Sequence, residues 1–117
     1  MTRLTESRCE PCRGGVPPLD DAQIRPLAEQ VPDWEVIERD GVKRLSREFK
    51  FDDFRGALDF TVRVGELAEQ EDHHPDIHLS WGRVRVEVWT HKIKGLHQND
   101  FIIAAKTDAL YGAGARR

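Results

Sequence analysis

The stretch EQEDHHPDIHLSWGRVRVEVWTHKIKGLHQND, residues 69–100, decides the fold of this chain, because it holds the end of one helix, a pair of strands and the start of another helix. It also carries all five histidines of the chain: His73, His74, His78, His91 and His97. Histidine is the side chain whose ordinary pKa allows proton exchange near neutral pH. The clustering therefore indicates acid–base chemistry or metal binding in this part of the chain.

The first residues of the stretch predict a corner between a helix and a strand. Glu69 closes an apolar-periodic segment and is expected on the last turn of a helix, with His73 at or just past its end. Pro75 cannot continue the helix, and it biases His74 towards an extended backbone. The partial negative charge of a helix C-terminus also favours a protonated imidazole. Such a corner holds both histidines in place and leaves them open to a ligand.

The rest of the chain supplies the elements around this corner. Asp40-Gly41 is a strong hairpin signal, and alternation of apolar residues predicts strands on both sides of it. The predicted helices cover residues 21–30, 52–71 and 98–111, and the predicted strands cover residues 34–39, 43–51, 76–81 and 84–91. The order α-β-β-α-β-β-α predicts an α+β fold, a two-layer structure in which three helices cover one face of a four-stranded antiparallel sheet.

Strand periodicity also places individual site candidates. Trp81 is expected on the same strand face as Ile77 and Leu79, because side chains two residues apart share a face. By the same rule, His91 is expected to end the last strand on its polar face, the face of Glu87.

Length and composition describe one globular domain. At 117 residues, with 38% hydrophobic and 33% charged residues, the chain is long enough to bury a core. We predict an irregular N-terminal arm over residues 1–18 and a single domain over residues 19–117. The chain has no apolar run of the ~20 residues that a membrane span requires and no visible signal segment, so a cytoplasmic location is expected. The net charge of −3 and the lack of a basic stripe argue against nucleic acid as a partner.

The two cysteines form a Cys9-x-x-Cys12 pair in the arm. One such pair is only half of a zinc site, and a thioredoxin-like redox motif would open a helix after a strand, whereas prolines and glycines surround this pair. Reduced cysteines without chemistry are therefore the favoured interpretation, and a metal contact or a redox pair stays as an alternative.

Taken one by one, the polar residues of the stretch have simpler interpretations. His73 and His74 can cap a helix C-terminus, His91 can be a surface residue, and Asp100 is favoured by the dipole at a helix N-terminus. A zinc site formed by the three histidines is a further alternative. Adjacent histidines on an extended corner point in different directions, however, which makes shared coordination awkward.

The joint spacing of these residues resembles a known family. Glu69-x3-His73-His74-Pro75, followed by Trp81, His91 and Asp100 at fixed distances, looks like the signature of the pterin-4a-carbinolamine dehydratases, and the text HHPDIHLSWGRVRVEVWTHKI and DFIIAAK is similar to theirs. The resemblance covers roughly residues 19–111. It implies the same two-layer fold that the element order predicts.

The resemblance further implies an enzyme that eliminates water from a 4a-hydroxytetrahydropterin in tetrahydrobiopterin recycling. It implies His73, His74 and His91 as catalytic residues and Glu69, Asp100 and Trp81 as substrate-binding residues. It implies neither a metal nor a cofactor, and it implies a homodimer or homotetramer. A non-catalytic pterin-binding or protein-partner module resembling a transcriptional cofactor, or a role in molybdopterin metabolism, stays as an alternative.

Two histidines stand apart from this pattern. His78 alternates with Ser80 on a strand and is expected to be structural or to face solvent. His97 occupies a position where members of the resembled family usually have a threonine that caps the last helix, and imidazole is not among the favoured N-cap groups.

Overall fold

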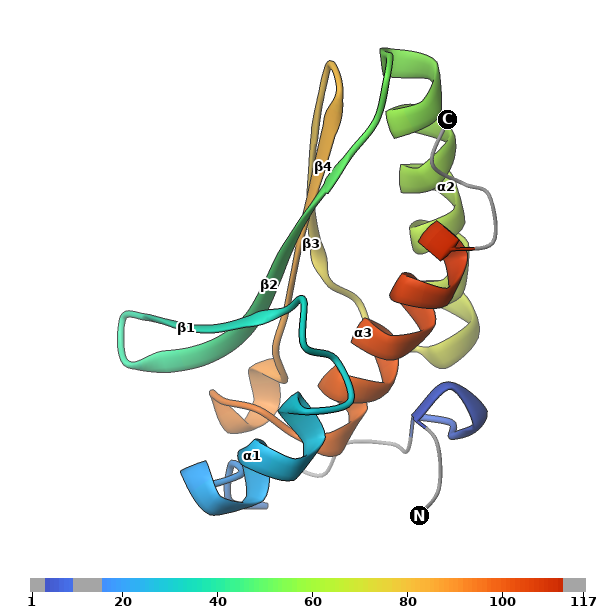
Figure 1. Ribbon diagram of the computed structural model, residues 1–117. Helices are drawn as coiled ribbons and strands as arrows, with labels where there is room; N and C mark the ends of the chain where they lie inside the picture. Colours follow the sequence, from blue (N-terminus) through green and yellow to red (C-terminus); the bar gives the residue numbers. More distant parts are fainter. Residues whose placement is uncertain (1–3, 10–15, 113–117) are drawn as a thin grey trace.

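A computed structural model describes residues 4–9 and 16–112 of the chain (Figure 1). Its helices are the 3-10 helix η1 (Leu4–Glu6), α1 (Asp21–Ala28), α2 (Phe54–Glu71), the 3-10 helix η2 (His91–Ile93) and α3 (Gln98–Leu110). Its strands are β1 (Glu35–Arg39), β2 (Val42–Lys50), β3 (Asp76–Ser80) and β4 (Arg83–Val88). The predicted order α-β-β-α-β-β-α is confirmed, and two one-turn 3-10 helices are added to it.

The four strands form one antiparallel sheet in the order β1-β2-β4-β3. Asp40 and Gly41 both have positive φ angles, 55° and 78°, as a tight hairpin turn between β1 and β2 requires. Pairs such as Leu45 with Val88 and Phe49 with Val84 lie directly opposite one another and fill the covered face. The predicted four-stranded antiparallel sheet is therefore confirmed.

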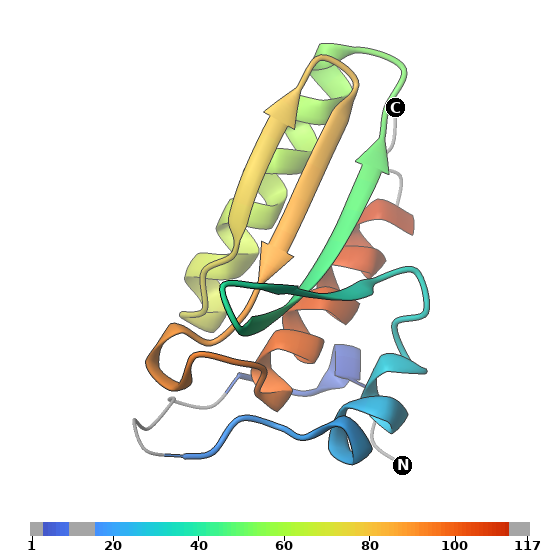
Figure 2. The same ribbon diagram turned by 90° about the vertical axis from the view of Figure 1, so that its left-hand side faces the viewer.

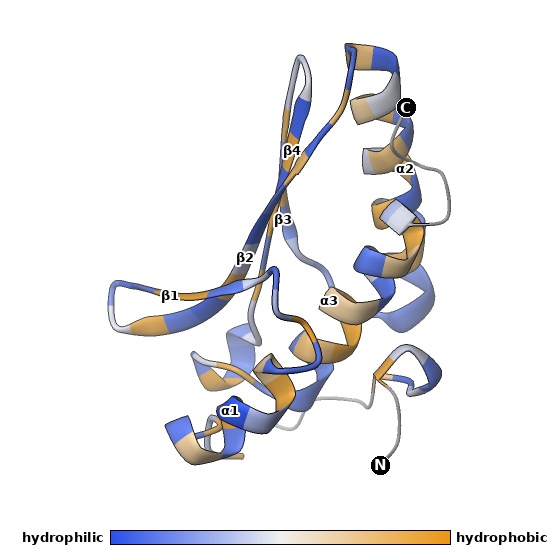
Figure 3. Cartoon of the chain, in the orientation of Figure 1, coloured by the Kyte–Doolittle hydropathy of each residue, from blue (hydrophilic) through white to orange (hydrophobic). Residues whose placement is uncertain are grey.

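The helices lie on one side of this sheet, and the core fills the space between the two layers (Figures 1 and 2). Figure 3 shows apolar residues along the side of α2 that is nearer the sheet, and α3 is buried over most of its length. Phe49, Phe60 and Phe101 are fully buried at the centre of this layer. The two long helices run in opposite directions (Figure 1), so the C-terminal end of α2 and the N-terminal end of α3 meet at the same end of the molecule.

Three local predictions need correction. α1 ends at Ala28, two residues after Pro26, because proline removes a backbone hydrogen bond and hinders a longer helix. His91 does not end a strand, because β4 stops at Val88 and His91 begins η2. Trp81 is not on the covered strand face either, because it lies in the turn after β3 and its side chain is 69% exposed.

The described part of the N-terminal arm is attached to the domain. Leu4 begins the 3-10 helix η1 and is only 3% exposed, within the hydrophobic core. Cys9 is half-buried, whereas Cys12 lies outside the described residues, so the predicted Cys9-x-x-Cys12 pair is only half described. Within residues 4–9 and 16–112, no helix is long and apolar enough to cross a bilayer.

Candidate active site

The corner predicted after α2 is formed by a left-handed residue. Asp72, the C-cap of α2, has φ 51° and ψ 43°, a conformation that aspartate tolerates better than most residues. Its backbone turn brings the N–H of His73 back to the carbonyl of Ala68 at 3.1 Å. The helix end is thereby capped, and the His73 side chain leaves it in a fixed direction, towards the start of α3.

The His73 side chain meets Asp100 across the two helix ends. Nε2 of His73 lies 2.6 Å from Oδ1 of Asp100, which joins residues 27 positions apart in the sequence. The Asp100 side chain is fully buried, and that of His73 is 12% exposed. One end of the pair is therefore shielded from water while the imidazole retains a path to solvent or to a ligand.

The second oxygen of Asp100 is held by two neutral donors. The hydroxyl of Thr90 and the backbone N–H of His97 both donate to Oδ2, each at 2.9 Å. A carboxylate can only accept hydrogen bonds, so in this pair Nε2 of His73 carries the proton. The bond orients the ring and leaves Nδ1 as the ring nitrogen that does not contact Asp100.

His97 caps α3, contrary to the usual preference for small polar caps. Its Nδ1 accepts from the N–H of Asn99 at 3.0 Å, and Asp100 returns the bond to the His97 N–H, so the two residues form a capping box. The imidazole replaces the expected threonine without displacing Asp100. The acidic residue in the first turn also suits the positive end of the helix dipole.

His91 lies next to this network. It follows Thr90, whose hydroxyl binds Asp100, and its exposed ring stacks on Trp89 with centroids 4.3 Å apart and planes 11° from parallel. The guanidinium of Arg44 lies 3.8 Å from the centroid of the Trp89 ring. The aromatic contact holds the second imidazole flat against the end of β4.

His74 and Glu69 form an exposed pair beside the corner. Nε2 of His74 lies 2.5 Å from Oε2 of Glu69, and the two side chains are 55% and 77% exposed. Solvent screens such a pair, so it contributes little to stability. Its position next to His73 leaves it free to contact a ligand that enters the corner.

Trp81 is the one predicted site residue that the structure does not bring to this corner. It lies beyond the far end of β3, five strand residues away from the corner, a span of ~16 Å at 3.3 Å per residue. The Phe51 N–H donates to the carbonyl of Gly82 at this opposite end of the sheet. Within one chain, the candidate site at this corner contains His73, His74, His91, Glu69 and Asp100, and Trp81 lies apart from them.

A metal site shared by the histidines is the alternative to these separate pairs. Among the residues that the structure describes, no group of three or more His, Cys, Asp or Glu side chains is placed to hold a metal ion. His73 and His74 instead each pair with a separate carboxylate, that of Asp100 or Glu69. The neighbouring histidines thus point in different directions, as an extended corner before proline requires.

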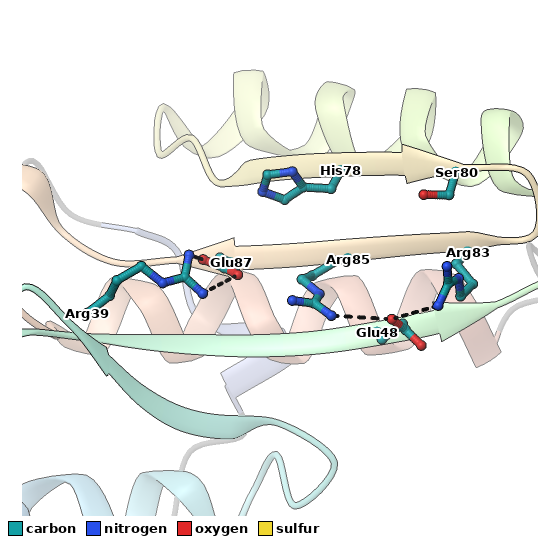
Figure 4. A pocket seen from close by; sticks show the side chains of 7 residues that line it. All are labelled: Arg39, Glu48, His78, Ser80, Arg83, Arg85 and Glu87. Atoms are coloured by element: carbon teal, nitrogen blue, oxygen red, sulfur yellow. Dashed lines mark hydrogen bonds and ion pairs between the residues drawn. The ribbon is translucent and has the colours of Figure 1, made fainter.

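A second polar region lies on the open face of the sheet (Figure 4). A hollow of about 290 Å³ is lined by Arg39, Glu48, His78, Ser80, Arg83, Arg85 and Glu87. Glu87 binds the Arg39 guanidinium through both oxygens, at 3.0 and 3.3 Å, and Glu48 lies 3.5 Å from Arg85 and 3.8 Å from Arg83. His78 is exposed there, and none of the residues of the candidate site lines this hollow.

Sequence reasoning missed two residues that contact the candidate site. Thr90 supplies a hydroxyl to Asp100, and Trp89 supports His91. Trp89 had a detectable signal, because a large aromatic residue on the polar side of a strand pattern is unusual. Thr90 had none, because a single hydroxyl near a strand end says nothing about a carboxylate ten residues later.

The fold and the site define a class. This is a two-layer α+β protein in which a buried carboxylate binds one of several histidines at a corner between two helix ends. The sequence profile of the family Pterin 4 alpha carbinolamine dehydratase matches residues 17–110. The chain belongs to this family.

Bacterial relatives align over almost the whole chain. A protein of Syntrophotalea carbinolica, provisionally named a pterin-4-alpha-carbinolamine dehydratase, is 56% identical over 110 residues, which cover 94% of this chain and 98% of that protein. A protein of Rubrobacter xylanophilus with the same provisional name is 53% identical over 110 residues, 94% of this chain and the whole of that protein. The activity in these names is that of a hydro-lyase.

Solved structures share the fold. The crystal structure of a transcriptional coactivator/pterin dehydratase from Brucella melitensis matches with a TM-score of 0.74 and 30% identity, over 81% of this chain and 99% of that one. A pterin dehydratase-like protein described as a RuBisCO assembly factor of the alpha-carboxysome matches with a TM-score of 0.59 over 68% of this chain and 90% of that one. At 21% identity, the second likeness concerns the fold alone.

Proposed function

We propose that this chain is a dehydratase that eliminates water from a 4a-hydroxytetrahydropterin to give a quinonoid dihydropterin, in tetrahydrobiopterin recycling. The observation that carries the proposal is the His73–Asp100 pair, with its 2.6 Å contact and fully buried carboxylate. Family membership supplies the substrate class, because the relatives are provisionally named for the pterin carbinolamine reaction.

The chemistry suits imidazoles. The hydroxyl on the carbinolamine carbon must leave as water and therefore needs a proton, while the neighbouring ring nitrogen must lose one. General acid and base groups work best when their pKa lies near the operating pH, and histidine meets that condition for both steps. Two imidazoles on opposite sides of a flat ring are sufficient for this elimination, since each handles one proton.

The assignment of roles follows from the contacts. His73, oriented by Asp100 with Nδ1 available, and His91, held against Trp89, form the acid–base pair. His74 and Glu69 are exposed beside them and contact the pterin from the open side of the corner. Asp100 orients His73 from the core and acts on the substrate only through that imidazole.

The test is a direct rate measurement. A 4a-hydroxytetrahydropterin is generated chemically or with an aromatic amino acid hydroxylase, and its decay is followed by absorbance with and without the protein. We expect acceleration that rises in proportion to protein concentration. A folded protein that leaves the decay rate unchanged would contradict the proposal.

We also propose that the chain forms a homodimer or a homotetramer. Phe54 and Val62 of α2 are exposed, at 43% and 53%, although the sequence pattern groups them with the apolar residues of that helix. Light scattering of the full chain tests the proposal, and a monomer at micromolar concentration would contradict it.

A partner-binding role is the second candidate function, because the name of the Brucella melitensis structure joins a transcriptional coactivator to a pterin dehydratase. This role would require a defined complex with another protein, whereas the dehydratase requires none. Full turnover by the purified protein alone favours the enzyme.

A further inference from the structure

The N-terminal arm makes contacts that the dehydratase chemistry does not use. Its described segment, residues 4–9, lies beside the lower ends of α2 and α3 in Figure 1 and packs against α3 through η1. These are the two helix ends that carry His73 and Asp100. The arm segment therefore touches the scaffold of the site from the side of the core.

Two anchors attach this segment. Leu4 is 3% exposed and belongs to the main hydrophobic core. At the other end, the backbone N–H of Cys9 donates to Oε1 of Glu71 at 2.8 Å, and Cys9 Sγ lies 3.6 Å from the carbonyl of Asn99. Glu71 is two residues before His73, and Asn99 is the residue before Asp100.

Glu71 also bridges the two helices. Its other oxygen, Oε2, lies 2.6 Å from Nζ of Lys106 on α3, and the two side chains are 11% and 18% exposed. One carboxylate thus receives the arm and an ammonium group of the facing helix. A well-shielded ion pair with an additional backbone donor fixes its partners more firmly than an exposed pair does.

We propose that the arm segment is a clamp that positions the His73–Asp100 pair, with Glu71 as its central positioning residue. The clamp connects the arm to the end of α2 through the Cys9 N–H and Glu71, and to the start of α3 through the Cys9 thiol and the Asn99 carbonyl, while Lys106 binds Glu71 from further along α3. The His73–Asp100 contact connects the same two helix ends. The inference rests on the proposed function for its effect on rate, and on the geometry alone for its effect on local order.

The thiol of Cys9 takes no part in chemistry in this arrangement. Burial, followed by the neighbouring Glu71 carboxylate, raises the pKa of Cys9 to about 12, so the thiolate is scarce at neutral pH. Cys9 contributes to the clamp its backbone N–H, which binds Glu71, and its un-ionised thiol, which contacts the Asn99 carbonyl. The clamp therefore requires neither redox chemistry nor metal binding by the cysteine pair.

A matched pair of variants tests the clamp. Cys9→Pro removes the N–H that binds Glu71, whereas Cys9→Ser keeps it and changes only the side chain. We expect Cys9→Pro to lower kcat about three- to ten-fold, because small displacements of catalytic groups are costly, and Cys9→Ser to match the wild type. Leu4→Ala releases the other anchor and is expected to lower kcat in the same range. Equal kcat in all four proteins would overturn the proposal.

A double-mutant cycle separates positioning from general destabilisation. In an Asp100→Asn background the pair is already impaired, so Cys9→Pro is expected to cost little further rate. An undiminished cost in that background would contradict a clamp that acts through the pair.

Hydrogen exchange provides a measurement that does not depend on turnover. We expect faster exchange in Cys9→Pro at the amides of His73 and Asp100, which bond to Ala68 and His97, and no change at the amide of Phe51 at the opposite end. Unchanged exchange at His73 and Asp100 would refute the clamp. If wild-type protein lacks dehydratase activity, the proposed function fails while this exchange result still decides the clamp.

Discussion

Two regions of this protein, the corner that carries His73 and the open face of the sheet, each hold a buried carboxylate but surround it with different partners. Asp100 in the corner is fully buried and receives a hydroxyl, a backbone N–H and an imidazole. Glu87 on the sheet face is 2% exposed and lies near the guanidinium groups of Arg39 and Arg44. Guanidinium groups keep their proton at all working pH values. The corner therefore contains a group that can exchange a proton, whereas the sheet face contains a fixed ion pair.

The largest effect is expected from removing the corner carboxylate. Asp100→Asn leaves nearly the same shape but no longer fixes the His73 proton on Nε2, and we expect kcat to fall by about 10²-fold, the lower end of what acid–base groups contribute. Glu87→Gln on the sheet face is the matched control. Its kcat is expected to stay within about two-fold of wild type, which is roughly the scatter of such rate measurements. Comparable losses in both variants would erase the distinction between the two regions.

The sheet-face carboxylate is expected to contribute to stability and not to turnover. Glu87→Gln leaves the two guanidinium groups without their carboxylate and is expected to lower the free energy of unfolding by about 1–2 kcal/mol. The cost stays below the about 3–5 kcal/mol of a fully buried pair because Arg39 is half-exposed. Urea unfolding measures it. A variant as stable as wild type would show that this ion pair contributes nothing.

The acid dependence of stability tests the ion pair below the corner. Burial acts against the ionised form of Glu71, but the hydrogen bonds from Lys106 and from the Cys9 N–H prevail and hold the pKa of its carboxyl below the ordinary 4.5. A lowered pKa in the folded state stabilises the protein above the unfolded pKa, and this contribution is lost as the pH falls through the folded pKa. Below about pH 5, Glu71→Gln is therefore expected to lose stability less steeply than wild type. Parallel urea-unfolding curves across this range would contradict the account.

The smallest effect is expected at His78. This exposed histidine lines the hollow on the sheet face. His78→Ala is therefore expected to change the free energy of unfolding by no more than about 0.5 kcal/mol and to leave kcat unaltered. A turnover defect in this variant would extend the active site to the sheet face.

What the sequence predicted, and what it did not, depends on the range of the contacts. The corner at Pro75 and the hairpin at Asp40-Gly41 were predictable because proline and glycine act on their own backbone. The separation of Trp81 from His73 follows from strand length, which sequence patterns define only to within a few residues. The bond from Thr90 to Asp100 was not predictable, because periodicity reports which face a residue occupies and not which partner it meets.

The contacts of the N-terminal arm were not predictable for the same reason. Residues 1–18 lack periodicity, and the sequence therefore predicts an irregular segment. The contact of Cys9 with Glu71 spans 62 positions and uses a backbone N–H, which has no side-chain signature. The capping role of His97 was missed for a different reason, since general cap preferences rank imidazole below the small polar residues that usually serve.

The central claim is that His73 transfers a proton and does not merely close a helix. The most direct test is the dehydration rate of a 4a-hydroxytetrahydropterin with His73→Ala, measured with and without added imidazole. We expect a loss of about 10²- to 10⁴-fold in kcat, with part of the rate restored by imidazole in the variant and no such gain in wild type. A His73→Ala protein that retains the full rate would contradict the claim.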